Sequence, residues 1–337
     1  MMNFHKRVLK IDPECEIQRI CGYLRDTVHK SLRRYGAVVG ISGGIDSSAV
    51  LGLCVRAFSP HRVIAVMMPD RDSDPESELL ARELAATFGV TPVLESITAA
   101  VDGFGCYRRR DEAIRRIFPE FDADKGYTVK IGLPQNLLEA DTLSVFTVTI
   151  ADPDGREKSS PLPGPEFLQI MAASNLKQRA RMATLYYHAE RNNYAVVGTA
   201  NKNEHDQGFF VKYGDGGVDV HAIAHLYKTQ VYQVAEYLGV PESIRRRPPT
   251  TDTYSAPISQ QEFFFRLPFE TMDLLWSAQE NGVPVSEVAR VMDLTEVQVQ
   301  RAFADFTRKK RTTSYLRTPP LSLEPTAIGE PAPLADR

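Results

Sequence analysis

The stretch Ala37-Val38-Val39-Gly40-Ile41-Ser42-Gly43-Gly44-Ile45-Asp46-Ser47-Ser48-Ala49-Val50-Leu51 decides the fold. An apolar run of strand character leads into a Ser-Gly-Gly turn, and Asp-Ser-Ser with helical apolar spacing follows. The pattern predicts a strand, a loop and the N-terminus of a helix. Such a terminus presents backbone N–H groups without intrahelical partners at the positive end of the helix dipole. The geometry suits a pyrophosphate.

The side chains of this loop favour an anion site that also holds a metal ion. The two glycines let the backbone turn and approach an anion without a Cβ in the way. Asp46 is the exception, because a carboxylate repels phosphate. It is explained if it binds Mg²⁺, since magnesium sites combine one or two carboxylates with phosphate oxygens. The glycines are Gly43 and Gly44, and the hydroxyl donors are Ser42, Ser47 and Ser48.

Three other interpretations of the loop can be compared with this one. A Walker loop needs Gly-Lys-Ser/Thr after its second glycine, and a dinucleotide fingerprint needs Gly-x-Gly-x-x-Gly; this loop has neither. The third interpretation is an ordinary strand-to-helix turn. The string Ser-Gly-Gly-Ile-Asp-Ser-Ser after a strand instead resembles the PP-loop of the adenine-nucleotide α-hydrolases. That resemblance implies cleavage of ATP between its α and β phosphates and activation of a substrate as an adenylate.

The composition of the chain is typical of a globular protein and limits its domain size, partners and compartment. With 337 residues, 43% hydrophobic and 25% charged, the chain can form one large domain, with or without an extension. The net charge of −3 gives no electrostatic reason to expect binding to nucleic acid or membranes. Four cysteines without C-x-x-C spacing favour reduced thiols. Because residues 1–10 lack a signal-peptide core and no apolar run approaches 18 residues, we expect a cytoplasmic protein.

The rest of the chain alternates strands with helices of about a dozen residues. This alternation predicts a doubly wound, Rossmann-like, mostly parallel sheet flanked by helices. In such a sheet the ligand site lies at the carboxyl ends of the strands, where the Ser-Gly-Gly loop stands. The expected helices are 14–34, 49–58, 76–88 and 167–191, and the expected further strands are 62–69, 90–94 and 194–199.

Residues 98–165 interrupt this rhythm. They include a basic piece at 108–118 and two strand-like runs at 127–132 and 143–150. So long an interval is unusual as a plain connection inside a compact domain, so we expect an inserted hairpin or lid. The three arginines 108–110 could reach phosphates, but the pattern favours a solvated charge run.

Four segments are expected, with boundaries at changes of composition. Residues 1–36 form an N-terminal helical segment, and 37–255 form the nucleotide-binding domain with the insertion at about 98–165. Residues 256–318 form a C-terminal helical extension. Residues 319–337 hold five prolines and are expected to be disordered.

A pattern in the C-terminal extension suggests an alternative function, DNA binding. Residues 285–301 have the spacing of a helix-turn-helix, and the basic run 308–311 follows. A recognition helix would need a basic face, whereas the second helix here carries Glu296 and two glutamines. We therefore expect a packed helix pair and no nucleic-acid partner.

Polar residues after the later strands complete the candidate site. The strand 194–199 runs into Gly-Thr-Ala-Asn-Lys-Asn-Glu, and Glu204 is the natural second magnesium carboxylate beside Asp46. The alternative interpretation of Glu204 is an ordinary residue in the first turn of a helix. Lys228 begins a helix, where it can meet a phosphate. Three glycines around Asp215 form a loop open to a ligand or, alternatively, a tight turn.

Besides the Ser-Gly-Gly loop, five polar motifs follow in the chain, at residues 175–182, 198–204, 212–217, 226–230 and 249–252. In this order they resemble the motifs of the NAD synthases, and the resemblance spans about residues 37–320. It implies that the nicotinate carboxylate of deamido-NAD attacks the α-phosphate of ATP. Pyrophosphate then leaves, and ammonia displaces AMP from the adenylate to give the amide.

The resemblance also implies roles for single residues. Catalysis would consist of positioning and charge neutralisation by Asp46, Glu204 and Lys228 with Mg²⁺, without a side-chain nucleophile. Asp46 and Glu204 would bind the metal. The ATP site would comprise Ser42, Gly43, Gly44, Asp46, Ser47, Ser48, Met68, Thr199, Lys228 and Thr250, and the deamido-NAD site Arg181, Lys212 and Asp215.

The family resemblance further implies a homodimer. The chain has no room for an amide-hydrolysing domain, so we expect free ammonia or a separate glutaminase partner to supply the nitrogen. Because the interval 98–165 is longer than the connection in compact ammonia-dependent members, a different carboxylate substrate stays open as an alternative.

Overall fold

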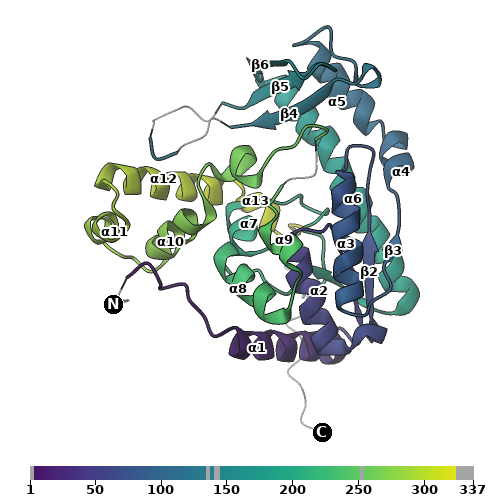
Figure 1. Ribbon diagram of the computed structural model, residues 1–337, viewed down its shortest axis with the longest axis vertical. Coiled ribbons are helices and arrows are strands. Elements are labelled where there is room, and N and C mark those ends of the chain that lie inside the picture. The colour runs from purple at the N-terminus through teal and green to yellow at the C-terminus, as the bar shows by residue number, and fades with distance from the viewer. Residues whose placement is uncertain (1–3, 134–136, 140–144, 251–253, 324–337) are drawn as a thin grey trace.

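A five-stranded, fully parallel sheet forms the centre of the computed structural model, which describes residues 4–133, 137–139, 145–250 and 254–323 (Figure 1). The strand order is β3-β2-β1-β7-β8, so the loop-bearing strand β1 lies in the middle. This confirms the expected doubly wound sheet, with one short strand, β8, more than expected. The strands are β1 Ala37–Gly40, β2 Val63–Met67, β3 Val93–Leu94, β7 Ala195–Gly198 and β8 Val220–His221.

Helices cover both faces of this sheet because successive strand residues point to opposite sides. Ala37 and Val39 of β1 pack into the core under one helical layer, and Val38 packs into the core under the other. One layer contains α1 Pro13–Arg25, α2 Ile45–Phe58, α3 Pro75–Thr87 and α8 Lys228–Leu238; the other contains α5 Cys106–Arg115 and α6 Gly164–Asn192.

Short elements complete the domain. The helix expected at 14–34 runs as α1 and then as a π-helical turn, Asp26–Ser31. In the ranges described, no helix combines the length and the apolarity needed to cross a bilayer. The remaining short helices are α4 Thr98–Gly103, α7 Lys202–Gln207 and α9 Glu242–Arg246, with 3-10 turns at Pro60–Arg62 and Ala123–Lys125.

The insertion forms a small antiparallel sheet at one end of the molecule (Figure 1). Its strands are β4 Thr128–Gly132, β5 Thr147–Ala151 and β6 Glu157–Pro161, one more than the expected hairpin. Residues 143 and 144 of the strand expected at 143–150 lie outside the described residues. Ile131 and Ile150 pack with Phe263 of the C-terminal half in one hydrophobic core. The insertion therefore shares a hydrophobic core with the C-terminal half of the chain.

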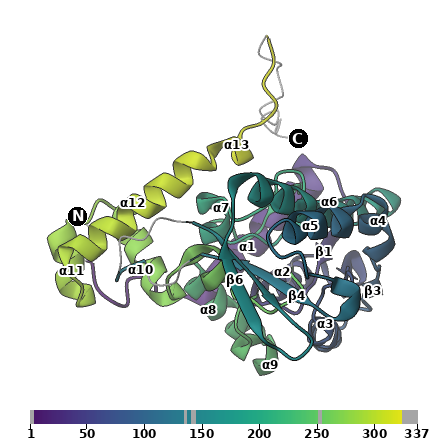
Figure 2. The same cartoon turned by 90° about the horizontal axis from the view of Figure 1, so that it is seen from above.

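The C-terminal extension is a set of helices that projects to one side of the sheet domain (Figures 1 and 2). Val288 of α11 and Phe306 of α12 pack with Trp276 of α10, which confirms the expected helix pair. Phe4 and Leu9 join the same core. Residues 324–337 of the tail expected to be disordered lie outside the described residues. The extension comprises a π-helical turn Gln261–Phe265, α10 Phe269–Glu280, α11 Val285–Met292, α12 Glu296–Thr312 and α13 Ser314–Arg317.

The packing of the insertion gives a first prediction. Replacing the fully buried Ile131 by Ala should lower the free energy of unfolding by about 2–5 kcal/mol, because it leaves a cavity in the core shared with Phe263. Val145→Ala, where the side chain is 44% exposed, should change it by less than about 0.5 kcal/mol. Urea unfolding followed by circular dichroism measures both. A loosely attached lid would leave the main unfolding transition of Ile131→Ala unchanged.

Candidate active site

The Ser-Gly-Gly loop takes its shape from steric limits at one glycine. Gly43 has φ +72°, in the left-handed region that favours glycine. A Cβ on Gly43 would also lie 2.8 Å from the Ser77 carbonyl oxygen and from the Leu80 Cβ. The hydroxyls of Ser47 and Ser48 both donate to the Gly44 carbonyl, at 3.0 and 2.8 Å. The loop is thus fixed against α3 and the start of α2.

A cavity of about 1100 Å³ opens in front of this loop. It exceeds the roughly 300–1,000 Å³ of ordinary small-molecule pockets, so it can hold more than one substrate. Three candidate residues, Gly43, Ser48 and Lys228, do not line this cavity. The candidate residues that do line it are Ser42, Gly44, Asp46, Ser47, Met68, Arg181, Thr199, Glu204, Lys212, Asp215 and Thr250.

A buried ion pair joins the loop helix to α8. The Lys228 ammonium donates to Oδ2 of Asp46, and Asn201 Nδ2 donates to Oδ1 of Asp46 at 3.0 Å. The Lys228 side chain is completely buried. Burial by itself would lower the pKa of Lys228, but the carboxylates of Asp46 and Glu204 outweigh it and raise the pKa above its usual value. Lys228 therefore stays a cation at the base of the site.

Glu204 occupies the first turn of α7, as one of the two interpretations of the sequence expects, and it also lines the cavity. Its backbone N–H donates to Asn201 Oδ1 and its Oε2 accepts from the Asn201 N–H, both at 3.1 Å, which makes a capping box. Its Oε1 accepts from Gln260 Nε2 at 3.1 Å. Burial and the nearby Asp46 carboxylate raise the pKa of Glu204 to about 8.

The paired carboxylates have the chemistry of a magnesium site. Mg²⁺ prefers oxygen ligands and is commonly held by one or two carboxylates with phosphate oxygens and water. Asp46 and Glu204 both line the cavity beside the anion loop. No group of three or more His, Cys, Asp or Glu side chains suited to a metal occurs in the described part of the chain. Asp46 and Glu204 therefore fit Mg²⁺ together with ATP phosphates.

Two of the candidate substrate residues lie in the loop 210–217 before β8. Lys212 Nζ donates to the carbonyls of Tyr315 and Thr318, at 3.0 and 2.6 Å, so the C-terminal segment closes over the loop. Asp215 Oδ1 accepts from the Val211 N–H at 2.7 Å. Burial raises the pKa of Asp215 to about 6. Both side chains have protein partners while lining the cavity.

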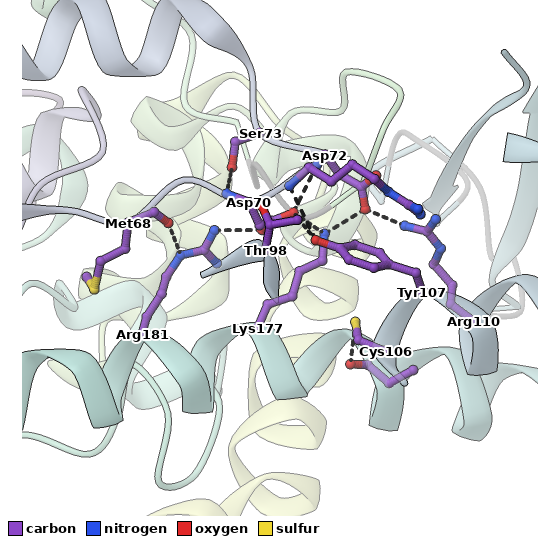
Figure 3. A network of polar contacts seen from close by, with 12 residues as sticks. Met68, Asp70, Asp72, Ser73, Thr98, Cys106, Tyr107, Arg110, Lys177 and Arg181 are labelled. Carbon is purple, nitrogen blue, oxygen red and sulfur yellow. Dashed lines mark hydrogen bonds and ion pairs between the residues drawn. The ribbon is translucent and has the colours of Figure 1, made fainter. Parts of the chain in front are cut away.

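The third candidate substrate residue, Arg181, belongs to a buried ionic network that follows β2 (Figure 3). Its Nε donates to the Met68 carbonyl at 3.1 Å, and its guanidinium pairs with Asp70 at 2.9 Å. Lys177 binds Asp70 and Asp72 at 2.9 and 2.8 Å. The network holds the loop after β2 against α6.

Arg110 extends this network to the insertion. It pairs with Asp72 at 2.5 Å and with Asp111 at 2.8 Å, and its side chain is only 1% exposed. Burial would raise the pKa of Asp72, but Arg110 and Lys177 outweigh it and lower that pKa. The expected solvated run at 108–110 is therefore wrong for Arg110, because its helical position turns it toward the acidic loop; Arg108 and Arg109 are exposed.

Sequence reasoning missed one residue of this region, Asp273 of α10. Its Oδ1 accepts from the Asn203 amide, and its Oδ2 accepts from the Thr229 N–H at 2.8 Å. Burial raises its pKa to about 6. Asp273 therefore fixes the neighbours of both Glu204 and Lys228. The available signal was a lone carboxylate in the apolar run Thr-Met-Asp-Leu-Leu-Trp.

The parallel sheet, the Ser-Gly-Gly loop at its centre and the paired carboxylates in front define a nucleotide-binding protein of the PP-loop class. A family model described as NAD synthase matches residues 16–115 and 137–319, and the chain belongs to this family. The internal stretch that the model does not match, residues 116–136, lies in the insertion and includes β4.

Relatives in sequence and structure agree with this family. The chain is 49% identical to an NH₃-dependent NAD⁺ synthetase of Mesorhizobium japonicum, over 93% of this chain and 98% of the relative. It is 47% identical to the enzyme of that name from Rhizobium meliloti, over 96% and 95%. In fold it is similar to the NH₃-dependent NAD synthetase of Campylobacter jejuni (TM-score 0.60, 21% identity, 93% and 100% covered). It is also similar in fold to an NMN synthetase of Francisella tularensis (TM-score 0.57, 21% identity, 93% and 99% covered).

The ionic network gives a second prediction. Lys177→Met should lower the free energy of unfolding by about 3–5 kcal/mol, because Asp70 and Asp72 stay buried with less compensating charge. Lys158→Met, which removes an exposed lysine paired with Glu120, should leave stability nearly unchanged. Urea unfolding at neutral pH measures both. Equal, small effects would show that the network is not a structural support.

Proposed function

We propose that the chain is an ammonia-dependent NAD synthase, an ATP-dependent amide ligase that converts deamido-NAD to NAD with release of AMP and pyrophosphate. One observation carries the proposal: Asp46, Glu204 and Lys228 converge beside the Ser-Gly-Gly loop. The adjoining cavity of about 1100 Å³ is large enough for two substrates. Membership of the NAD synthase family supports the choice of reaction.

In this mechanism the chain supplies positioning and positive charge. The loop hydroxyls of Ser42 and Ser47, with the N–H groups at the start of α2, hold the ATP phosphates. Thr199, Thr250 and Met68 line the ATP side of the cavity, and Arg181, Lys212 and Asp215 bind the second substrate. Mg²⁺, bound by Asp46 and Glu204, would neutralise phosphate charge.

The reaction has two steps. A carboxylate oxygen of the nicotinate attacks the α-phosphorus, the new O–P bond forms, and the bond to the bridging oxygen breaks so that its electron pair leaves with pyrophosphate. The buried Lys228 ammonium, hydrogen-bonded to Asp46, supplies positive charge at the base of the site that offsets the charge developing on the phosphate oxygens. Ammonia then attacks the carbonyl carbon, the C–O bond to AMP breaks, and the amide nitrogen gives up a proton. The side chains need only hold the reactants in line.

The proposal includes assembly and context. In it, residues 37–255 form the ligase domain, and 256–318 support it through Gln260 and Asp273. The chain acts in the cytoplasm as a homodimer and takes free ammonia or ammonia from a separate glutaminase. The free thiols of the four cysteines support a reducing compartment such as the cytoplasm, and the homodimer rests on the family resemblance. Sedimentation at two protein concentrations tests the dimer.

The third prediction tests the activity. Incubation of the protein with ATP, Mg²⁺, ammonium and deamido-NAD should yield NAD, AMP and pyrophosphate in equal amounts. A parallel incubation replaces deamido-NAD by nicotinate mononucleotide, because one structural neighbour is named an NMN synthetase. Chromatography of the nucleotides reads both. Folded, ATP-binding protein that forms no NAD would overturn the proposal, and amidation of the mononucleotide alone would reassign the substrate.

The fourth prediction tests the metal ligands. Asp46→Asn and Glu204→Gln should each lower kcat/KM by about 100-fold or more and raise the Mg²⁺ concentration for half-maximal rate, since each removes one carboxylate from the cation. Asp206→Asn, on the same helix as Glu204 but paired with Lys202, is the matched control. Unchanged Mg²⁺ titrations in the two ligand variants would contradict the assignment.

A further inference from the structure

Arg247 is a cavity residue that the assigned site does not include. It follows α9, precedes Pro248 and Pro249, and lines the cavity that contains the Ser-Gly-Gly loop. Its side chain is 12% exposed. Both terminal nitrogens of the guanidinium donate to Ser77 Oγ at 3.1 Å, and one also pairs with Asp74 at 3.0 Å. The cation is held in a fixed orientation at the cavity wall.

Ser77 connects this guanidinium directly to the anion loop. Its hydroxyl accepts from Arg247, while its carbonyl oxygen lies 2.8 Å from the position that a Cβ on Gly43 would take. The backbone of one residue therefore contacts the loop and its side chain contacts the guanidinium. The arginine lies beside the loop, on the side of α3.

The position of the bond that breaks in ATP determines which of its phosphates face α3. The α-phosphorus must lie near the second substrate, because the substrate carboxylate attacks it. The second-substrate residues come from α6 and from the loop 210–217, as Arg181 and Lys212 do. Within the described residues Arg247 makes no hydrogen bond or ion pair with Arg181 or Lys212. Thr250, on the ATP side, is three residues farther along the chain. The leaving phosphates then point toward α3 and Arg247.

We propose that Arg247 binds the β- and γ-phosphates of ATP and stabilises the pyrophosphate that leaves. The inference rests on the proposed function for the point of cleavage, between the α- and β-phosphates. When that bond breaks, the electron pair stays on the pyrophosphate oxygen, and the planar guanidinium can donate two parallel hydrogen bonds to the leaving group. In the structure the carboxylates of Asp74 and Glu76 lie against the guanidinium, at 3.0 and 3.8 Å.

If the ion pair between Asp74 and Arg247 breaks, Asp74 keeps its role as the N-cap of α3. Its Oδ1 already accepts from the Glu76 N–H at 2.9 Å as the cap of α3. Only Oδ2 pairs with Arg247. The competing interpretation is that Arg247 is a structural tether between α3 and the segment after α9, and the experiment separates the two.

The test uses three variants of the full chain: Arg247→Ala, Arg247→Lys and the control Arg246→Ala. Arg246 is on α9, pairs with Glu242 and is 79% exposed. For each variant the KM values of ATP and deamido-NAD are measured, together with product inhibition by pyrophosphate and by AMP. Melting temperatures check folding, and Arg247→Lys provides the test if Arg247→Ala does not fold.

Arg247→Ala should raise KM for ATP and the inhibition constant of pyrophosphate about 10- to 100-fold, as expected for loss of a charge-assisted contact. KM for deamido-NAD and inhibition by AMP should stay within about twofold. Arg247→Lys should fall between, because lysine keeps the charge and loses the planar fork. Arg246→Ala should match the parent.

Unchanged pyrophosphate inhibition in folded Arg247→Ala overturns the inference. Equal changes in all four constants together with a lower melting temperature also overturn it, in favour of a tether. Should the parent protein form no NAD, the proposed function fails by itself. Calorimetric titration with magnesium pyrophosphate and with AMP then tests Arg247 independently, since only pyrophosphate binding should weaken in the variant.

Discussion

The buried ion pair between Lys228 and Asp46 is the contact on which the site depends. Moving the Lys228 ammonium out of water costs free energy, and the attraction of the nearby Asp46 and Glu204 carboxyl groups offsets this cost. The pair also ties the start of α8 to the start of α2, two elements separated by 182 residues in the chain. Loss of Asp46 would leave the fully buried Lys228 ammonium without its hydrogen-bonded carboxylate. The same contact therefore links two elements of the fold and keeps a cation directly beneath Asp46, which lines the cavity.

The support for this pair reaches beyond the sheet domain. Asn201 donates to Asp46 and caps the helix that carries Glu204. Gln260 and Asp273 of the C-terminal extension hold Glu204 and the N-terminus of α8. The C-terminal extension thus helps to hold the site residues in position. The match to the NAD synthase family, which runs to residue 319, includes this extension.

Local patterns were enough to predict the sheet and the shape of the Ser-Gly-Gly loop, because strand, glycine turn and helix start each have a sequence signature. The strand β6 was missed because Glu-Lys-Ser-Ser-Pro at a sheet edge lacks apolar alternation. Arg110, Arg247 and Asp273 each contact a partner 38 or more residues away, so their local sequence does not show which groups they bind. The roles of the predicted site residues came from the ordered motifs, and the structure adds where the side chains lie.

The central claim is that this site joins an acid to AMP before ammonia takes part. Exchange of labelled pyrophosphate into ATP tests it most directly, with Mg²⁺ and deamido-NAD present and ammonium omitted. The account predicts exchange that requires deamido-NAD and disappears in Lys228→Met. Absence of exchange in a protein that forms NAD when ammonium is added, or exchange without deamido-NAD, would contradict it.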